Sequence, residues 1–336
     1  MRLVQLANGN LRSVALVREP HLVLLKEVTS IYQLAQRALA QKMELTKLIQ
    51  SLATGDTISY DDVYTQNSPM ALLVPIDVPG APQMTLVSGT GLTHLGSARE
   101  RQAMHAETMK TSDVEMTDSM RMFEWGREKG RPRPEEIGIA PEWFYKGDGA
   151  ILRGPFAPLN VPGYAEDGGE EAEMAAVYIV DSEGEPHRIG FCIGNEFSDH
   201  VFERKNYLNL AGSKLRACSL GPELVIDDKF NDVPGRVSIL RKDTVLWEKK
   251  ICTGEENMCH SLANLEHHHF KFEGHRQPGM VHVHFLGADA LSFGEGIRLS
   301  DGDVIEVSFE RFGRPLVNTI VVDKPITSPV GVKPMV

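Results

Sequence analysis

The sequence predicts an α+β protein, because strand-like and helix-like patterns occupy separate stretches of the chain. Residues 1–25 alternate apolar and polar side chains around the turn sequence Asn8-Gly9-Asn10, which is typical of a β-hairpin. Residues 26–53 repeat apolar side chains near helical spacing and contain no Gly or Pro. Residues 172–180 are apolar and partly β-branched, and a polar turn separates them from a second apolar run at 188–194. We expect these two runs to be paired strands.

Composition excludes several classes of protein. The 336 residues carry a net charge of −11, so no basic field would attract the phosphates of a nucleic acid. No apolar run is long enough to span a bilayer, and we expect no membrane partner. The N-terminus lacks a signal-peptide core, and the four cysteines show no C-x-x-C spacing. A cytoplasmic protein with reduced thiols is the expectation.

We expect the first part of the chain to form a separate unit. Residues 1–70 are interpreted as a small N-terminal domain or appendage, in which residues 56–68 are a polar linker. Residues 72–76 and 84–87 are predicted strands that open the larger domain, 71–336. A chain of this length has room for one large domain or two smaller ones.

Three carboxylates indicate a metal site. Glu171 and Glu173 share one face at the head of the predicted strand, where like charges repel unless a cation lies between them. Pairing of the two strands would bring Glu196 to the same level. Oxygen ligands without Cys or His favour Mg²⁺, with Mn²⁺ or Ca²⁺ as alternatives. The competing interpretation is that these are ordinary solvated carboxylates at strand ends.

The order of these residues resembles that of the fumarylacetoacetate hydrolase superfamily. The resemblance is carried by Glu171-Ala172-Glu173, by Asn195-Glu196-Phe197-Ser198, by Lys214 and by Ser219-Leu220-Gly221-Pro222, and it covers about residues 85–320. It implies a mixed β-sandwich roll with a few helices, a homodimer, and a catalytic role for Lys214. Hydrolases of the family usually have Asp where Glu196 stands. Glu is more similar to the branch that dehydrates 2-keto-3-deoxy sugar acids.

The resemblance also assigns expectations to two further stretches. Glu142 and Lys146 lie in a Pro-Glu-x-Phe-x-Lys pattern that lines the active site in the family. Glu142 is then a candidate for proton transfer, the alternative being a surface glutamate, and Lys146 is a candidate for substrate binding. Thr93-His94 stand where the family has Asn-Tyr, and Ser97 falls near the expected histidine of the hydrolases' water-activating His–Glu pair, a departure that disfavours hydrolysis. Residues 99–135 are expected to be a mobile helical lid or a solvated helical excursion.

Histidines offer a rival metal site. His282 and His284 share a face of the predicted strand 281–285, but no helical H-x-x-x-H and no paired cysteines accompany them. We therefore favour structural roles for them. Gly287-Ala288 lies where the family has a turn that meets the substrate carboxylate, and Ala288 lacks the hydroxyl expected there.

The function implied by the resemblance is a Mg²⁺-dependent dehydratase that acts through a metal-stabilised enolate. 2-Keto-3-deoxyarabonate, converted to 2,5-dioxopentanoate, is the favoured substrate. The first alternative is a C–C hydrolase or decarboxylase of acylpyruvate-type substrates, and the second is a ligand-binding relative without catalysis. The small-molecule partner in the favoured case is a 2-keto acid.

Overall fold

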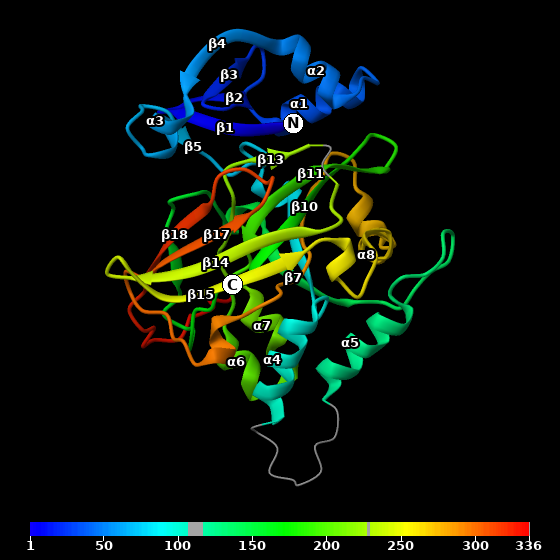
Figure 1. Cartoon of the computed structure of the whole chain (residues 1–336), viewed down its shortest axis with the longest axis vertical. Helices are drawn as coiled ribbons and strands as arrows, with labels where there is room; N and C mark the ends of the chain where they lie inside the picture. Colours follow the sequence, from blue (N-terminus) through cyan, green and yellow to red (C-terminus); the bar gives the residue numbers. More distant parts are fainter. Residues whose placement is uncertain (107–116, 227–228, 336) are drawn as a thin grey trace.

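The computed structural model describes residues 1–106, 117–226 and 229–335, and contains two β-sheets flanked by helices (Figure 1). The larger sheet has 13 strands in these residues: β1 (Arg2–Asn8), β2 (Leu11–Arg18), β3 (His21–Leu25), β4 (Ala53–Ser59), β5 (Ala71–Leu72), β6 (Thr85–Gly91), β7 (Glu142–Asp148), β8 (Leu152–Arg153), β10 (Ala172–Val180), β11 (Pro186–Asn195), β12 (Cys218–Leu220), β13 (Leu224–Val225) and β16 (Val281–Phe285). The smaller sheet has five: β9 (Leu159–Val161), β14 (Val233–Arg241), β15 (Thr244–Thr253), β17 (Val304–Phe309) and β18 (Leu316–Val322). The expected α+β architecture is confirmed.

The helices lie around the edges of the sheets. They are α1 (Ile31–Ala40), α2 (Leu45–Leu52), α3 (Tyr60–Tyr64), α4 (Leu95–Ala106), α5 (Asp118–Lys129), α6 (His200–Lys205), α7 (Leu210–Lys214) and α8 (Leu262–Phe270). In Figure 1, α4, α5, α6 and α7 gather at the end of the molecule opposite the N-terminal unit. None of the helices in the described ranges has the length and apolar character needed to cross a membrane.

The N-terminal region is more structured than its sequence predicts. The hairpin at Gly9 is confirmed, with Gly9 at φ 58°. The single helix expected over 26–53 is wrong, because α1 ends at Ala40, Lys42 has a φ of 49°, and α2 begins at Leu45. The expected linker 56–68 is also wrong, since it contains most of β4 and all of α3. β4 exists because it pairs with β3, a partner that local polarity does not reveal.

This N-terminal unit is hydrogen-bonded to the rest of the molecule. β1 pairs with β13 through Leu3 and Leu224, which continues the large sheet into the N-terminal unit. The Tyr60 hydroxyl donates to Glu223 at 2.8 Å, and both side chains are buried. A domain boundary near residue 70 stays a prediction.

The strands that carry the site are buried on both faces. Every residue of β10 is buried, and alternate side chains enter two different hydrophobic clusters. Ala175 and Val177 pack on one side, whereas Met174 and Tyr178 pack on the other. The sequence of a strand buried on both faces is a continuous apolar run and does not alternate between apolar and polar residues. The predicted pairing of β10 with β11 is confirmed.

Two other strand predictions differ from the structure. The strand expected over 72–76 is wrong beyond Leu72, and Pro75, three residues on, lacks the N–H that a ladder needs. The sequence also predicts a hairpin over 225–247 with its turn at Asp243-Thr244, and the structure has this hairpin with shifted bounds, as β14 and β15. Its turn, Lys242-Asp243, has φ 50° and 62°, the positive values that a tight hairpin turn requires. The expected helical character of 99–135 is confirmed in α4 and α5, but residues 107–116 lie outside the described part, and the lid stays a prediction.

Candidate functional site

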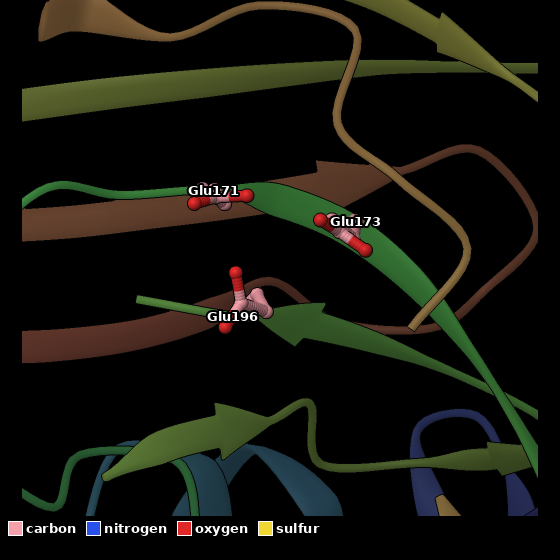
Figure 2. Close-up of side chains that lie close together, drawn as sticks. All are labelled: Glu171, Glu173 and Glu196. Carbon is pink, nitrogen blue, oxygen red and sulfur yellow. The ribbon is translucent and has the colours of Figure 1, made fainter. Parts of the chain in front are cut away.

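Three glutamates meet where β10 begins and β11 ends. Ala172 pairs with Asn195, which places Glu171 and Glu173 opposite the end of β11. The backbone N–H of Glu196 donates to the carbonyl of Glu171 at 2.9 Å. One carboxylate oxygen from each glutamate lies within 4.8 Å of the others, and all three residues are buried. Figure 2 shows the three side chains converging from the two neighbouring segments. The interpretation as solvated strand-end carboxylates is therefore wrong.

Lys214 connects two of these glutamates. Its Nζ lies 2.5 Å from Glu171 Oε1 and 2.5 Å from Glu196 Oε2, and it also donates to Ser198 Oγ at 2.9 Å. The ring of Phe144 lies beneath the ammonium, 4.7 Å from Nζ to the ring centroid. Burial alone would lower the pKa of Lys214, but Glu171 and Glu196 raise it above its ordinary value. The amine is therefore a fixed cation in this arrangement.

Lys146 holds the third glutamate from the other side. Its Nζ lies 2.5 Å from Glu196 Oε1 and donates to the carbonyls of Phe197 and Lys214, both at 2.9 Å. Lys146 stands on β7, where residues two apart share a face. Glu142, Phe144 and Lys146 are buried on that face, and the intervening residues are more exposed. One face of a single strand thus supplies three of the side chains around the site.

The carboxylates of Glu171 and Glu173 have opposite electrostatic environments. Burial would raise the pKa of Glu171, but Lys214 and a hydrogen bond from His200 hold it well below its usual value. Burial, together with the charges of Glu171 and Glu196, raises the pKa of Glu173 well above its usual value. The Gly287 N–H donates to Oε2 at 2.7 Å, and the charge of Lys214 also lowers the pKa of Glu173, but these two effects are smaller. Glu173 is therefore the carboxylate whose charge is least balanced by protein groups.

This donor set fits a hard divalent cation. Three buried carboxylates face one another, and Lys146 and Lys214 supply two positive charges. One negative charge of this group of five remains uncompensated, and it is concentrated on Glu173. Oxygen-only coordination is what Mg²⁺, Mn²⁺ and Ca²⁺ prefer. Among the described residues, no other group of three potential metal ligands lies close enough to hold an ion.

Glu142 belongs to a second group of charged side chains beside the first. Its Oε1 accepts from Arg101 Nη1 at 2.8 Å, and its Oε2 accepts from the Tyr207 hydroxyl at 2.8 Å. Arg101 Nε lies 3.1 Å from Glu203 Oε1. Glu142 is 6% exposed, so the alternative of a surface glutamate is wrong. Its proposed role in proton transfer stays a prediction.

Sequence reasoning missed four polar residues of this region. They are Arg101 on α4, His200 and Glu203 on α6, and Tyr207 in the turn that follows α6. His200 Nε2 lies 3.0 Å from Glu171 Oε1. His200 begins a helix capped by Asp199 and has Glu203 three residues on, a spacing that puts both on one helical face. That spacing is the one signal by which the pair could have been found.

His94 does not replace the water-activating histidine of hydrolases. It is buried, with Nδ1 2.8 Å from Thr93 Oγ1 and Nε2 3.0 Å from Thr253 Oγ1. Burial lowers the pKa of His94 to about 4. Both ring nitrogens are occupied by hydroxyls of the fold. His94, which departs from the family pattern, therefore has the surroundings of a structural histidine.

The rival histidine site has the geometry of a hydrogen-bonded core. His284 contacts Ser88 Oγ at 2.8 Å and Thr90 Oγ1 at 2.7 Å, and His282 contacts His269 at 2.9 Å. All of these histidines are buried. Among the described residues, only the three glutamates lie close enough together to hold a metal ion, which supports structural roles for the histidines.

Solved structures with the same fold cover nearly all of the chain. A 2-keto-3-deoxy-D-arabinonate dehydratase complexed with magnesium and 2,5-dioxopentanoate aligns with a TM-score of 0.70 and 18% identity, over 96% of this chain and 100% of that chain. A fumarylacetoacetate hydrolase from Exiguobacterium antarcticum aligns with a TM-score of 0.61 and 17% identity, over the same shares. A 5-carboxymethyl-2-hydroxymuconate delta-isomerase from Mycobacterium smegmatis aligns with a TM-score of 0.56 and 18% identity, again over 96% and 100%.

These similarities establish the fold. No sequence-family model matches the chain, and no curated protein sequence does. The structure nevertheless has the fold of fumarylacetoacetate hydrolase and of the dehydratase and isomerase named above, as the sequence motifs lead one to expect. Since that fold supports several reactions, the choice among them depends on the site.

Proposed function

We propose that this protein is a divalent-metal-dependent dehydratase of a 2-keto-3-deoxy sugar acid, with 2-keto-3-deoxyarabonate as the favoured substrate and 2,5-dioxopentanoate as the product. The observation that carries the proposal is the buried triad of Glu171, Glu173 and Glu196, clamped by Lys146 and Lys214. A 2,5-dioxopentanoate complex of a dehydratase with the same fold and with magnesium supports the choice of substrate.

Glu171, Glu173 and Glu196 would hold the ion, for which Mg²⁺ is the proposed identity. Bound there, Mg²⁺ would supply Lewis-acid polarisation of the keto group, worth several kcal/mol. Lys214 remains a cation beside the site, because two carboxylates raise its pKa. It would therefore stabilise developing negative charge on the substrate, rather than act as a base or form a Schiff base.

Glu142 is the proposed proton carrier. Its two oxygens are oriented by Arg101 and Tyr207, and it lies on the same face of β7 as Phe144 and Lys146. Glu142 would accept the C3 proton of the 2-keto acid. The electron pair left at C3 would then form the C3–C4 double bond as the C4–O bond breaks. The proton held by Glu142 would join the departing hydroxyl, so that water leaves and 5-hydroxy-2-oxopent-3-enoate remains. Loss of a C5 proton and return of a proton to C3 would then give the C4–C5 enol, which tautomerises to 2,5-dioxopentanoate.

Hydrolysis of an acylpyruvate is the weaker alternative on this fold. It needs a group that activates water, and both nitrogens of His94 are engaged by threonines. The side chain of His105 lies outside the described part. A role in ligand binding without catalysis has less support than hydrolysis, because it would give no function to the charged side chains clustered around Glu142.

The direct test is turnover of a panel of 2-keto-3-deoxy pentonates, 2-keto-3-deoxy hexonates and acylpyruvates, with Mg²⁺ and with excess chelator. We expect loss of one water from a sugar acid by mass spectrometry, dependent on Mg²⁺ and abolished by Glu173→Ala. Cleavage of an acylpyruvate would assign the protein to the hydrolases instead. Metal binding without turnover of any compound would favour the binding role. A homodimer and a cytoplasmic location also remain proposals, and light scattering in solution tests the first.

A further inference from the structure

Glu203 is a buried carboxylate that the proposed reaction does not use. It lies on α6, one turn after His200, and its side chain is 2% exposed. Neither of its oxygens accepts a hydrogen bond from any residue that the structure describes. Arg101 Nε is 3.1 Å from Oε1, but the contact lacks the alignment of a hydrogen bond. A buried acceptor left without a donor costs about 1–3 kcal/mol, so its presence indicates a ligand that supplies the donor.

The position of Glu203 connects it to the metal triad. Glu203 lies one helical turn after His200 on α6, and His200 Nε2 is 3.0 Å from Glu171 Oε1. On its other side, Arg101 links Glu203 to Glu142. Glu203 therefore lies between the proposed metal site and the proposed proton carrier, within electrostatic reach of both.

A glycine keeps this arrangement open. A Cβ added to Gly91, at the end of β6, would lie 1.9 Å from Glu142 Oε1 and 3.6 Å from Arg101 Nη1. Any larger residue at position 91 would displace the Glu142 carboxylate. The backbone of β6 is thus shaped to accept the pair formed by Glu142 and Arg101.

The charges around Arg101 favour hydroxyl groups over a second carboxylate. Glu142 and Glu203 share one guanidinium, which leaves this group of three with one net negative charge. A second carboxylate of a ligand would meet like charge in a buried place, where repulsion is strong. A hydroxyl can instead donate to a free oxygen of Glu203, in a charge-assisted hydrogen bond.

We propose that Glu203, positioned by Arg101, is a specificity residue that receives the hydroxylated end of a 2-keto monocarboxylic acid and rejects 2-keto dicarboxylic acids. This inference rests on the proposed function, since it takes the keto acid group to lie at the glutamate triad. The substrate class is defined by the group that the substrate carries at its end remote from the metal.

Three five-carbon ligands test the inference by binding alone. 2-Oxopentanoate, 5-hydroxy-2-oxopentanoate and 2-oxoglutarate differ only at C5, and none has a C4 hydroxyl to lose. Their affinities for the whole protein are measured by calorimetry with saturating Mg²⁺, for wild type, Glu203→Gln and the control Glu248→Gln. Glu248 is an exposed residue of β15, remote in sequence from the site segments, and it pairs with Arg236.

For the wild type we expect the hydroxylated compound to bind about 10- to 100-fold more tightly than 2-oxopentanoate, as one charge-assisted hydrogen bond provides. We expect 2-oxoglutarate to bind most weakly. In Glu203→Gln the preference for the hydroxyl falls by about tenfold or more and 2-oxoglutarate gains affinity, whereas 2-oxopentanoate is unchanged. Glu248→Gln should match the wild type for all three ligands.

Equal weakening of all three ligands in Glu203→Gln would show a structural role and overturn the inference. Tight binding of 2-oxoglutarate by the wild type would also overturn it. If the wild type dehydrates a sugar acid but Glu203→Gln keeps the same preferences, the inference fails and the proposed function stands. If no ligand of the series binds in the presence of Mg²⁺ and no sugar acid is dehydrated, both fail.

Discussion

The two faces of one sheet bury ionisable side chains in opposite ways. Glu173 lies on one face of β10, whereas His284 of β16 pairs with Ala176 and lies on the other. On the first face the groups are charged and are held by ion pairs with Lys146 and Lys214. On the second face, burial lowers the pKa values of His282 and His284 to about 3 and keeps both rings neutral.

This difference separates a site from a core. The neutral His284, whose two ring nitrogens are satisfied by Ser88 and Thr90, leaves no charge for a ligand. The three glutamates outnumber the two lysines that contact them, so part of their negative charge is uncompensated. This charge disfavours the metal-free site and favours a bound cation. A buried ionisable group indicates function only when the protein's own groups do not complete its environment.

The largest effect is expected from Lys214→Ala, which removes the cation between Glu171 and Glu196. Breaking a buried ion pair by removing one partner costs about 3–5 kcal/mol, because an unpaired charge stays buried. Urea unfolding without metal should show this loss, and Mg²⁺ should restore part of it. Lys205→Ala breaks the exposed pair with Glu166 and should cost about 0–1 kcal/mol. Equal losses in the two variants would contradict the role given to the buried pair.

Glu142→Gln should reduce turnover strongly and leave the metal site intact. A positioned acid or base contributes about 10²- to 10⁴-fold, so kcat should fall by that amount. The amide keeps the size of the side chain and its contacts with Arg101 and Tyr207 in part. Mg²⁺ affinity measured by calorimetry should match that of the wild type. A normal kcat would assign proton transfer to another residue.

Glu173→Gln should stabilise the metal-free protein at pH 7 and weaken Mg²⁺ binding. The pKa of Glu173 is raised in the folded state, so its contribution to stability is complete below its unfolded pKa and is lost as pH rises through the folded pKa. A neutral amide removes that loss, and we expect a higher free energy of unfolding in metal-free urea unfolding at pH 7. A loss of stability in Glu173→Gln would show that protein groups already balance the charge of the Glu173 carboxylate.

The smallest of these effects is expected from His94, which is buried in its neutral form. Its folded pKa of about 4 lies below the unfolded value of 6.5, so the unfolded chain binds the proton first as pH falls. Stability should therefore decline between pH 6.5 and pH 4, by about 2 kcal/mol at pH 5 from this residue. His94→Gln should flatten that part of the profile in urea unfolding. An unchanged profile would mean that other groups produce it.

Local patterns predicted the segments whose partners are close in sequence. The pairing of β10 with β11 follows from two apolar runs and one turn, and it brings Glu196 to Glu171 and Glu173. The N-terminal hairpin and the hairpin of β14 and β15 follow in the same way. β4 was missed because its partner, β3, lies across two helices in the sequence. When two segments are far apart in sequence, the composition of neither one reveals that they pair.

For the site, the sequence alone predicts the members of the cluster: three carboxylates and one lysine in an order that strand geometry brings together. Which of their charges are compensated depends on the tertiary fold. Lys146 reaches Glu196 from β7, Arg101 reaches Glu142 and Glu203 from α4, and Glu203 receives no donor in the described chain. Compensation depends on distances of a few ångströms between segments far apart in sequence, because electrostatic interactions in a buried site fall steeply with separation and with access of water.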